Sequence, residues 1–83
     1  MIDVQYFASV RERLGTDAEQ VDAAGVSTVA ALLELLVARH GDKGRRVLQE
    51  SRVLVAVNQV VAGPHAAVRS GDEVAFFPPV TGG

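Results

Sequence analysis

The last six residues of the chain combine a stiff proline pair with side chains of decreasing size, in the order Pro78, Pro79, Val80, Thr81, Gly82 and Gly83. Proline fixes its own φ, so the pair should project the tail away from the preceding segment as an extended stalk. The two glycines present backbone without a Cβ and suit a channel too narrow for larger residues. The pattern predicts a domain over residues 1–79 and an extended functional tail over residues 80–83.

The reacting group of such a tail is the carboxylate of Gly83. A carboxylate is unreactive until it enters a mixed anhydride such as an adenylate, after which sulfur or nitrogen can attack its carbon. Attack by sulfur gives a thiocarboxylate, and attack by nitrogen gives an amide. Two specified positions are both glycine by chance in about 0.5% of sequences, which favours this chemistry over the alternative of a frayed terminus.

Side chains that could catalyse a reaction are few. The chain has no cysteine, one tyrosine (Tyr6) and one lysine (Lys43). The lack of cysteine excludes disulfide scaffolds, zinc knuckles, iron–sulfur centres and a cysteine nucleophile. His40 suits the end of a helix and His65 a loop, with no further ligands nearby, so no metal site is expected. We expect a carrier or partner protein without a bound cofactor rather than a self-sufficient enzyme.

Length and charge limit the classes of partner. The chain has 83 residues, about the size of one small domain, and its 48% hydrophobic content is typical of a folded protein. A formal net charge of −2 disfavours a nucleic-acid partner. No apolar run approaches the roughly 20 residues that span a bilayer, and residues 1–3 do not open a signal peptide. We therefore expect a cytoplasmic protein that binds neither nucleic acid nor membrane.

The first third of the chain predicts two strands around a helical turn. Residues 2–8 alternate apolar and polar, as in a half-buried strand, with Phe7 on the polar face. Residues 9–12 match a capping box, which predicts a turn of helix that begins at Ser9 and ends near Gly15. Ala18–Val21 is expected to form a short strand paired with the first one.

The clearest element is a helix that begins at Ser27 or Thr28. Apolar residues at positions 29, 32, 33, 36 and 37 share one helix face, and Gly41 follows as the expected C-terminal residue. Residues 43–50 predict a further turn or two of helix, interrupted by Gly44.

A small basic cluster lies just after this helix. It consists of Lys43, Arg45 and Arg46, and the acids Asp42 and Glu50 flank it. Because exposed ion pairs of this kind contribute little, a solvated face is the favoured interpretation.

The second half of the chain predicts three more strands. Residues 53–57 are rich in β-branched side chains, a turn at residues 58–59 leads into residues 60–61, and residues 73–77 follow a second turn at residues 69–72. Strands on both sides of one long helix predict an α+β fold, in which the helix packs on one face of a mixed sheet.

Two aromatic rings are expected on the outer face of that sheet. Strand alternation places Phe7 and Phe77 there, and with Val61 they would form an exposed apolar patch for a partner. In the alternative, one of the rings tucks under a loop or the tail. Arg11 is expected to contact an acidic partner surface, unless it is only a solvated residue beside Glu12.

Three segments carry a resemblance to a known family: residues 6–12 (Tyr-Phe-Ala-Ser-Val-Arg-Glu), 55–58 (Val-Ala-Val-Asn) and 71–83 (Gly-Asp-Glu-Val-Ala-Phe-Phe-Pro-Pro-Val-Thr-Gly-Gly). They resemble the small subunit of molybdopterin synthase. The resemblance runs over the whole chain, and the last segment is highly specific. It implies a ubiquitin-like β-grasp fold and a non-catalytic sulfur carrier.

The resemblance also implies how the carrier works. Gly83 would be adenylated by an E1-like adenylyltransferase that consumes ATP, and then thiocarboxylated with sulfur from a donor protein. The tail would enter the large subunit, in a heterotetramer of two small and two large subunits, where sulfur passes to cyclic pyranopterin monophosphate and forms the dithiolene. Phe7 and Phe77 match positions that contact the large subunit and the activating enzyme, and Val61 matches less closely.

Two alternatives share the same tail. In the first, the thiocarboxylate serves thiamine, cysteine or tRNA thiolation; carriers for thiamine tend to be shorter and to lack the Phe-Phe-Pro-Pro stalk. In the second, the chain is a ubiquitin-like modifier or interaction module that Gly83 joins to lysines.

Overall fold

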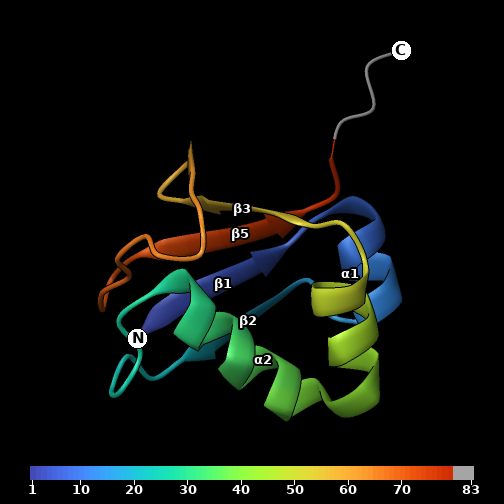
Figure 1. The fold of residues 1–83 in the computed structure, drawn as a ribbon, viewed down its shortest axis with the longest axis horizontal. Helices are drawn as coiled ribbons and strands as arrows, with labels where there is room; N and C mark the ends of the chain where they lie inside the picture. Colours follow the sequence, from blue (N-terminus) through green and yellow to red (C-terminus); the bar gives the residue numbers. More distant parts are fainter. Residues whose placement is uncertain (80–83) are drawn as a thin grey trace.

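Five strands form one mixed sheet in the computed structural model, which describes residues 1–79. The elements follow one another as β1 (Ile2–Tyr6), α1 (Ala8–Leu14), β2 (Ala18–Val21), α2 (Val29–Gly44), η1 (Arg45–Glu50), β3 (Leu54–Val57), β4 (Val60–Val61) and β5 (Glu73–Phe77). The sheet order is β2-β1-β5-β3-β4, so the first and last strands lie side by side at its centre. α2 lies along the sheet (Figure 1), which confirms the predicted α+β arrangement with one main helix.

The central pair of strands is parallel and its neighbours are antiparallel. β1 pairs with β5 so that Val4 lies opposite Val74 and Tyr6 opposite Phe76. β2 pairs antiparallel with β1, as the sequence predicted, and β3 pairs antiparallel with β5. Parallel strands are usually buried, and this pair carries the most deeply buried part of the sheet.

The core lies between the sheet and α2. Its largest fully buried side chains come from both layers and from the loop before β5: Tyr6, Phe76, Ile2, Leu32, Leu36, Val4, Val21, Val68 and Val74. Period-two alternation produces this separation in β1, where the three residues of one phase are buried and Asp3 and Phe7 are exposed. The strand phases expected from the sequence are therefore confirmed.

The helical turn after β1 begins earlier than the sequence predicted, and the Ser9 capping box is wrong. Phe7 is the N-terminal cap, has an extended backbone and makes no side-chain cap. Its N–H donates to the Phe76 carbonyl at 3.0 Å, so pairing with β5 holds the chain extended up to Phe7. Ala8 then turns the chain at once, with φ at 51°, and α1 ends at Gly15 as expected. Strand pairing, a tertiary effect, decides where this helix starts.

α2 begins and bends where local chemistry requires it. The Thr28 hydroxyl accepts a hydrogen bond from the Ala31 N–H at 3.1 Å, the N-cap that the sequence offered. At Gly41 the backbone leaves the helical region, with φ at 66°, and a second helical stretch continues through η1. Residues 43–50 are therefore helical, as predicted.

Gly44 does not interrupt this second stretch but permits it to pack. The residue is buried within the helix, and a Cβ placed on it would lie 2.7 Å from the Cβ of His40 and 3.2 Å from the Val37 carbonyl oxygen. Real Cβ atoms do not approach so closely, so only glycine lets the two helical stretches meet.

Candidate functional site

The outer face of the sheet carries apolar side chains around the end of β5. In the register of β3 and β5, Leu54 lies opposite Phe77, and Ala56 lies opposite Ala75. Phe76, the neighbour of Phe77, is fully buried in the core. Because successive side chains of a strand point to opposite faces, Phe77 and Leu54 point away from the core.

Phe7 and Val61 extend this face on its two sides. The hydrogen bond from the Phe7 N–H to the Phe76 carbonyl continues the parallel register by one residue and brings Phe7 beside Phe77. Phe7 is 44% exposed. On the other side Val61 pairs with Ala56 and is 67% exposed. We define the outer patch as Phe7, Leu54, Val61, Ala75 and Phe77.

The structure therefore brings three of the four predicted partner residues to one face. Arg11 is on α1, one helical turn after Phe7; its N–H donates to the Phe7 carbonyl at 3.4 Å, and its side chain is exposed. Sequence reasoning missed Leu54 and Ala75, although both stand in the outer phase of their strands. That the patch binds a partner stays a prediction, now with a defined surface.

The stalk leaves from the edge of this patch. Pro78 and Pro79 follow β5 directly and are half-buried. Neither has an N–H, so neither can donate to β3, and the pairing of the two strands ends at Leu54 and Phe77. The remaining predicted tail residues, Val80 to Gly83, lie outside the described residues.

A hydrogen-bonded turn fixes the start of the strand that carries the stalk. Gly71 has φ at 92°, and the Asp72 carboxylate accepts from the Arg69 N–H at 2.8 Å and from the Asn58 amide at 3.1 Å. The Asn58 side-chain carbonyl in turn accepts from the Glu73 N–H at 3.0 Å. The hydrogen bond from the Asn58 side chain, followed by that from the Arg69 N–H, lowers the pKa of the Asp72 carboxyl below its ordinary value. The Gly-Asp pair of the closing motif therefore sets the register of β5.

On the opposite face of the sheet, four side chains form a polar network at the edge of the core. The Glu19 carboxylate accepts from the Tyr6 hydroxyl at 2.7 Å and from Arg39 Nη1 at 2.7 Å, and it lies 2.6 Å from His40 Nε2. The Tyr6 ring packs edge-on against His40 and stacks on Phe76. His40 thus has a specific partner, beyond its expected place at the end of a helix.

Burial and hydrogen bonding within this network shift the pKa values of Tyr6 and Glu19. Burial, and then the hydrogen bond to Glu19, raise the pKa of Tyr6 above its ordinary value, so the phenol remains a donor. Burial alone would raise the pKa of Glu19, but the hydrogen bonds from Tyr6, His40 and Arg39 outweigh it and lower that pKa. The network fastens β1 and β2 to α2, and we assign it a structural role.

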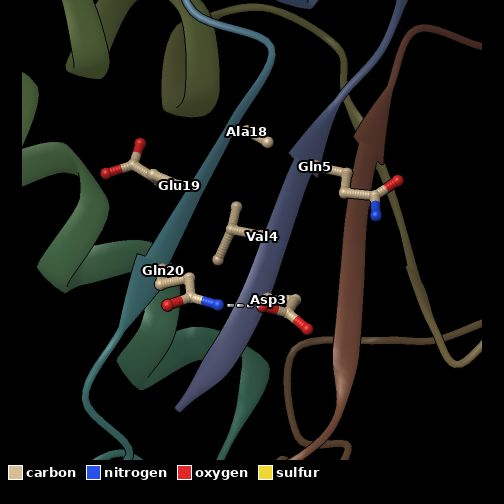
Figure 2. Close-up of a pocket in the computed structure, with 6 residues that line it drawn as sticks. All are labelled: Asp3, Val4, Gln5, Ala18, Glu19 and Gln20. Carbon is tan, nitrogen blue, oxygen red and sulfur yellow. Dashed lines mark hydrogen bonds between the residues drawn. The ribbon is translucent and has the colours of Figure 1, made fainter.

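A shallow pocket of about 290 Å³ lies over β1 and β2 (Figure 2). Its lining residues are Asp3, Val4, Gln5, Ala18, Glu19 and Gln20. The Gln20 amide donates to the Asp3 carboxylate at 2.8 Å, and the Glu19 carboxylate points toward α2 rather than toward these groups. Its polar groups therefore do not converge on a common point, and it is not a candidate active site.

The described part of the chain contains neither a group of metal-binding side chains nor a membrane-spanning helix. Within residues 1–79, no three or more His, Cys, Asp or Glu side chains gather in a way that could hold a metal ion. None of the helices over the same residues is long and apolar enough to cross a bilayer.

Comparison with known proteins shows the family of the chain. The sequence matches the ThiS family over residues 4–83. The chain belongs to the ThiS family. This membership confirms the family resemblance and the ubiquitin-like β-grasp fold expected from the sequence.

Three relatives of this ThiS-family chain are informative. It is 48% identical to the molybdopterin synthase sulfur carrier subunit of Escherichia coli and 46% identical to that of Haemophilus influenzae, each over 83 residues and the full length of both chains. The crystal structure of small archaeal modifier protein 1 from Haloferax volcanii superposes with a TM-score of 0.75 at 34% identity, covering 99% of this chain and 98% of that one. The proteins similar to this chain therefore include both carriers and a modifier.

Proposed function

We propose that the chain is the sulfur carrier subunit of a molybdopterin synthase. The observation that carries this proposal is the identity of 46% and 48%, without any length difference, to two proteins named as that subunit. The outer patch supports it, because an apolar surface beside the stalk offers a partner a place to grip the domain that delivers the tail.

The chemistry takes place at the Gly83 carboxylate. An E1-like enzyme transfers AMP from ATP to this carboxylate and releases pyrophosphate, which makes the carbonyl carbon open to attack. Sulfur from a donor protein displaces AMP and leaves a thiocarboxylate. The large subunit of the synthase then receives the tail, and the sulfur passes to cyclic pyranopterin monophosphate. The carrier supplies no catalytic side chain, which agrees with its small inventory of such residues.

The test is the intact mass of the protein after incubation with its activating enzyme, ATP and a sulfur source. We expect the mass to increase by the difference between one sulfur and one oxygen, and the product to convert the pterin substrate when the large subunit is added. Deletion of Gly83 should abolish both results while the melting temperature stays nearly unchanged. A deletion variant that still forms molybdopterin would contradict the proposal.

Gly82→Ala provides a second variant for the tail. The added Cβ should obstruct a narrow channel, so product formation should slow more than folding is impaired. Transfer and large-subunit affinity equal to those of the wild type would show that no such channel is needed.

A protein-modifier role is the second candidate, favoured by the likeness to small archaeal modifier protein 1. It predicts that activated Gly83 forms amide bonds with lysines rather than a stable thiocarboxylate. Mass spectrometry of proteins captured from the host separates the two, because a modifier leaves its C-terminal glycines on lysine side chains of other proteins.

A further inference from the structure

Cations gather at the end of the molecule where α1, η1 and the start of β3 meet. Arg13, Lys43, Arg46 and Arg52 are all exposed there, and we call these four the cationic surface. Hydrogen bonds tie their elements together: Arg13 Nη1 donates to the Ser51 hydroxyl at 2.6 Å, and this hydroxyl donates to the Arg46 carbonyl at 2.9 Å. Lys43 Nζ donates to the Leu14 carbonyl at 3.4 Å.

Nearby acids form no ion pair with this surface in the described residues. Asp42 and Glu50 both bind Arg45, at 3.3 and 2.7 Å, so Arg45 is the solvated ion pair that the sequence suggested. Over residues 1–79, none of the four cations of the surface takes part in an ion pair. Glu12 and Asp17 are the other acids of α1 and the loop that follows it. The fold has thus added Arg13 and Arg52 to the part of the basic cluster that remains without a counter-ion.

The position of this surface relative to the stalk suggests its use. Arg52 lies two residues before Leu54, and Leu54 pairs with Phe77 at the end of β5. α1 and the last helical turns lie at the end of the molecule where β5 finishes, and the N-terminus lies at the other end (Figure 1). At that other end two acids face each other across the central strands, Asp3 and Glu73. Asp3 and Glu73 therefore lie at the start of β5, and the cationic surface lies near its end.

We propose that the cationic surface binds an acidic surface on the large subunit that receives the tail; the inference rests on the proposed function. A net charge of −2 makes a polyanion such as RNA a poor occupant, because the rest of the molecule repels it. An acidic protein surface of limited extent attracts the cationic end alone. The attraction between the two surfaces orients the approaching carrier with its stalk toward the large subunit. It raises the association rate rather than the lifetime of the complex.

The test compares single charge reversals that alter net charge equally, and adds a double variant that alters it twice as much. Arg46→Glu, Arg52→Glu and the double variant remove the positive field beside the stalk, and both side chains are exposed without bonding partners in the described chain. Arg69→Glu, in the turn before β5, is the control at the other end, and its melting temperature is measured as well because Arg69 lies beside Asp72. Stopped-flow association with the large subunit of the same organism is followed across a range of salt concentrations.

We expect the double variant to associate about tenfold more slowly at low salt, with a weaker salt dependence, while its dissociation rate and melting temperature remain those of the wild type. Single variants that match Arg69→Glu in both rate and salt dependence would overturn this inference alone. A wild-type carrier that fails to bind the large subunit would overturn the proposed function as well. Binding of a single-stranded RNA that is lost in the variants, with subunit association unchanged, would assign the surface to nucleic acid and overturn the inference.

Discussion

Phe76 and Phe77 are the same residue type at neighbouring positions of β5, yet they belong to different regions. Phe76 is fully buried against Tyr6 on the inner face, where α2 also packs. Phe77 is half-buried on the outer face, opposite Leu54 and beside Phe7. The inner face is closed by the protein itself, whereas the outer face leaves apolar area that a second protein could cover. Strand alternation alone places one ring in the core and the other on the outer face.

Removing the inner ring should have the largest effect. Phe76→Ala leaves a cavity between β5 and Tyr6, and we expect the free energy of unfolding to fall by about 3–5 kcal/mol. A loss of that size is comparable to the whole stability of many small domains. Denaturant unfolding followed by far-UV circular dichroism measures it. If the variant does not fold, the smaller truncation Val74→Ala on the same face keeps the prediction testable; loss below about 1 kcal/mol for Phe76→Ala would refute it.

The helical layer behind the inner face should be nearly as sensitive to an added methyl group. Gly44→Ala forces a Cβ to within 2.7 Å of the His40 Cβ, and overpacking of this kind costs about 1–3 kcal/mol. Gly63→Ala is the control, because a Cβ there meets nothing within 4 Å. The same unfolding measurement applies to both. Equal stability of the two variants would mean that the helical stretches can separate without cost.

The outer ring should behave in the opposite way. Phe77→Ala should lower stability much less than Phe76→Ala, but weaken binding of the large subunit by about 1–2 kcal/mol. Val61→Ala and Val60→Ala sharpen the comparison, since both valines are about two-thirds exposed and only Val61 belongs to the outer patch. Affinity is read by calorimetric titration. A stability loss for Phe77→Ala as large as that for Phe76→Ala would withdraw the patch and place the ring in the core.

The polar network should give the smallest effect, and one that depends on pH. The folded pKa of Glu19 lies below its ordinary value of 4.5, so its contribution to stability is present above that value and is lost as the pH falls through the folded pKa. Glu19→Gln keeps the shape but not the charge, and we expect a loss of about 1 kcal/mol at pH 7 that shrinks below pH 4.5. Asp42→Asn, whose carboxylate is largely exposed, is the control. A loss for Glu19→Gln that does not vary with pH would contradict the assignment.

Local patterns accounted for much of the fold. The Thr28 cap, the break at Gly41, the turn at residues 58–59 and the phase of each main strand follow from side-chain chemistry within a few residues. The turn is a clear case, because Asn58 and Gln59 both take positive φ, as a two-residue hairpin requires. The same alternation placed Phe7 and Phe77, two of the four predicted partner residues, on the outer face.

What could not be predicted depends on contacts between distant segments. The start of α1 is decided by β5, about seventy residues later in the chain. His40 meets Glu19 only because β2 lies beside the end of α2, which no pattern within either segment indicates. Likewise Arg13 and Arg52 join the basic cluster through Ser51 and the meeting of α1 with η1. These contacts follow from the topology of the fold, which hydrophobic periodicity and secondary-structure propensity do not predict.

The central position of β5 also bears on synthesis. It is the last of the five strands to leave the ribosome, which delivers the N-terminal part of a chain first. Until it arrives, β1 and β3 have no strand between them, and each presents an open edge. A product that ends before Glu73 therefore lacks the middle strand of its sheet and leaves β1 and β3 unpaired on that side. The segment directly before the stalk is thus also the strand that completes the sheet.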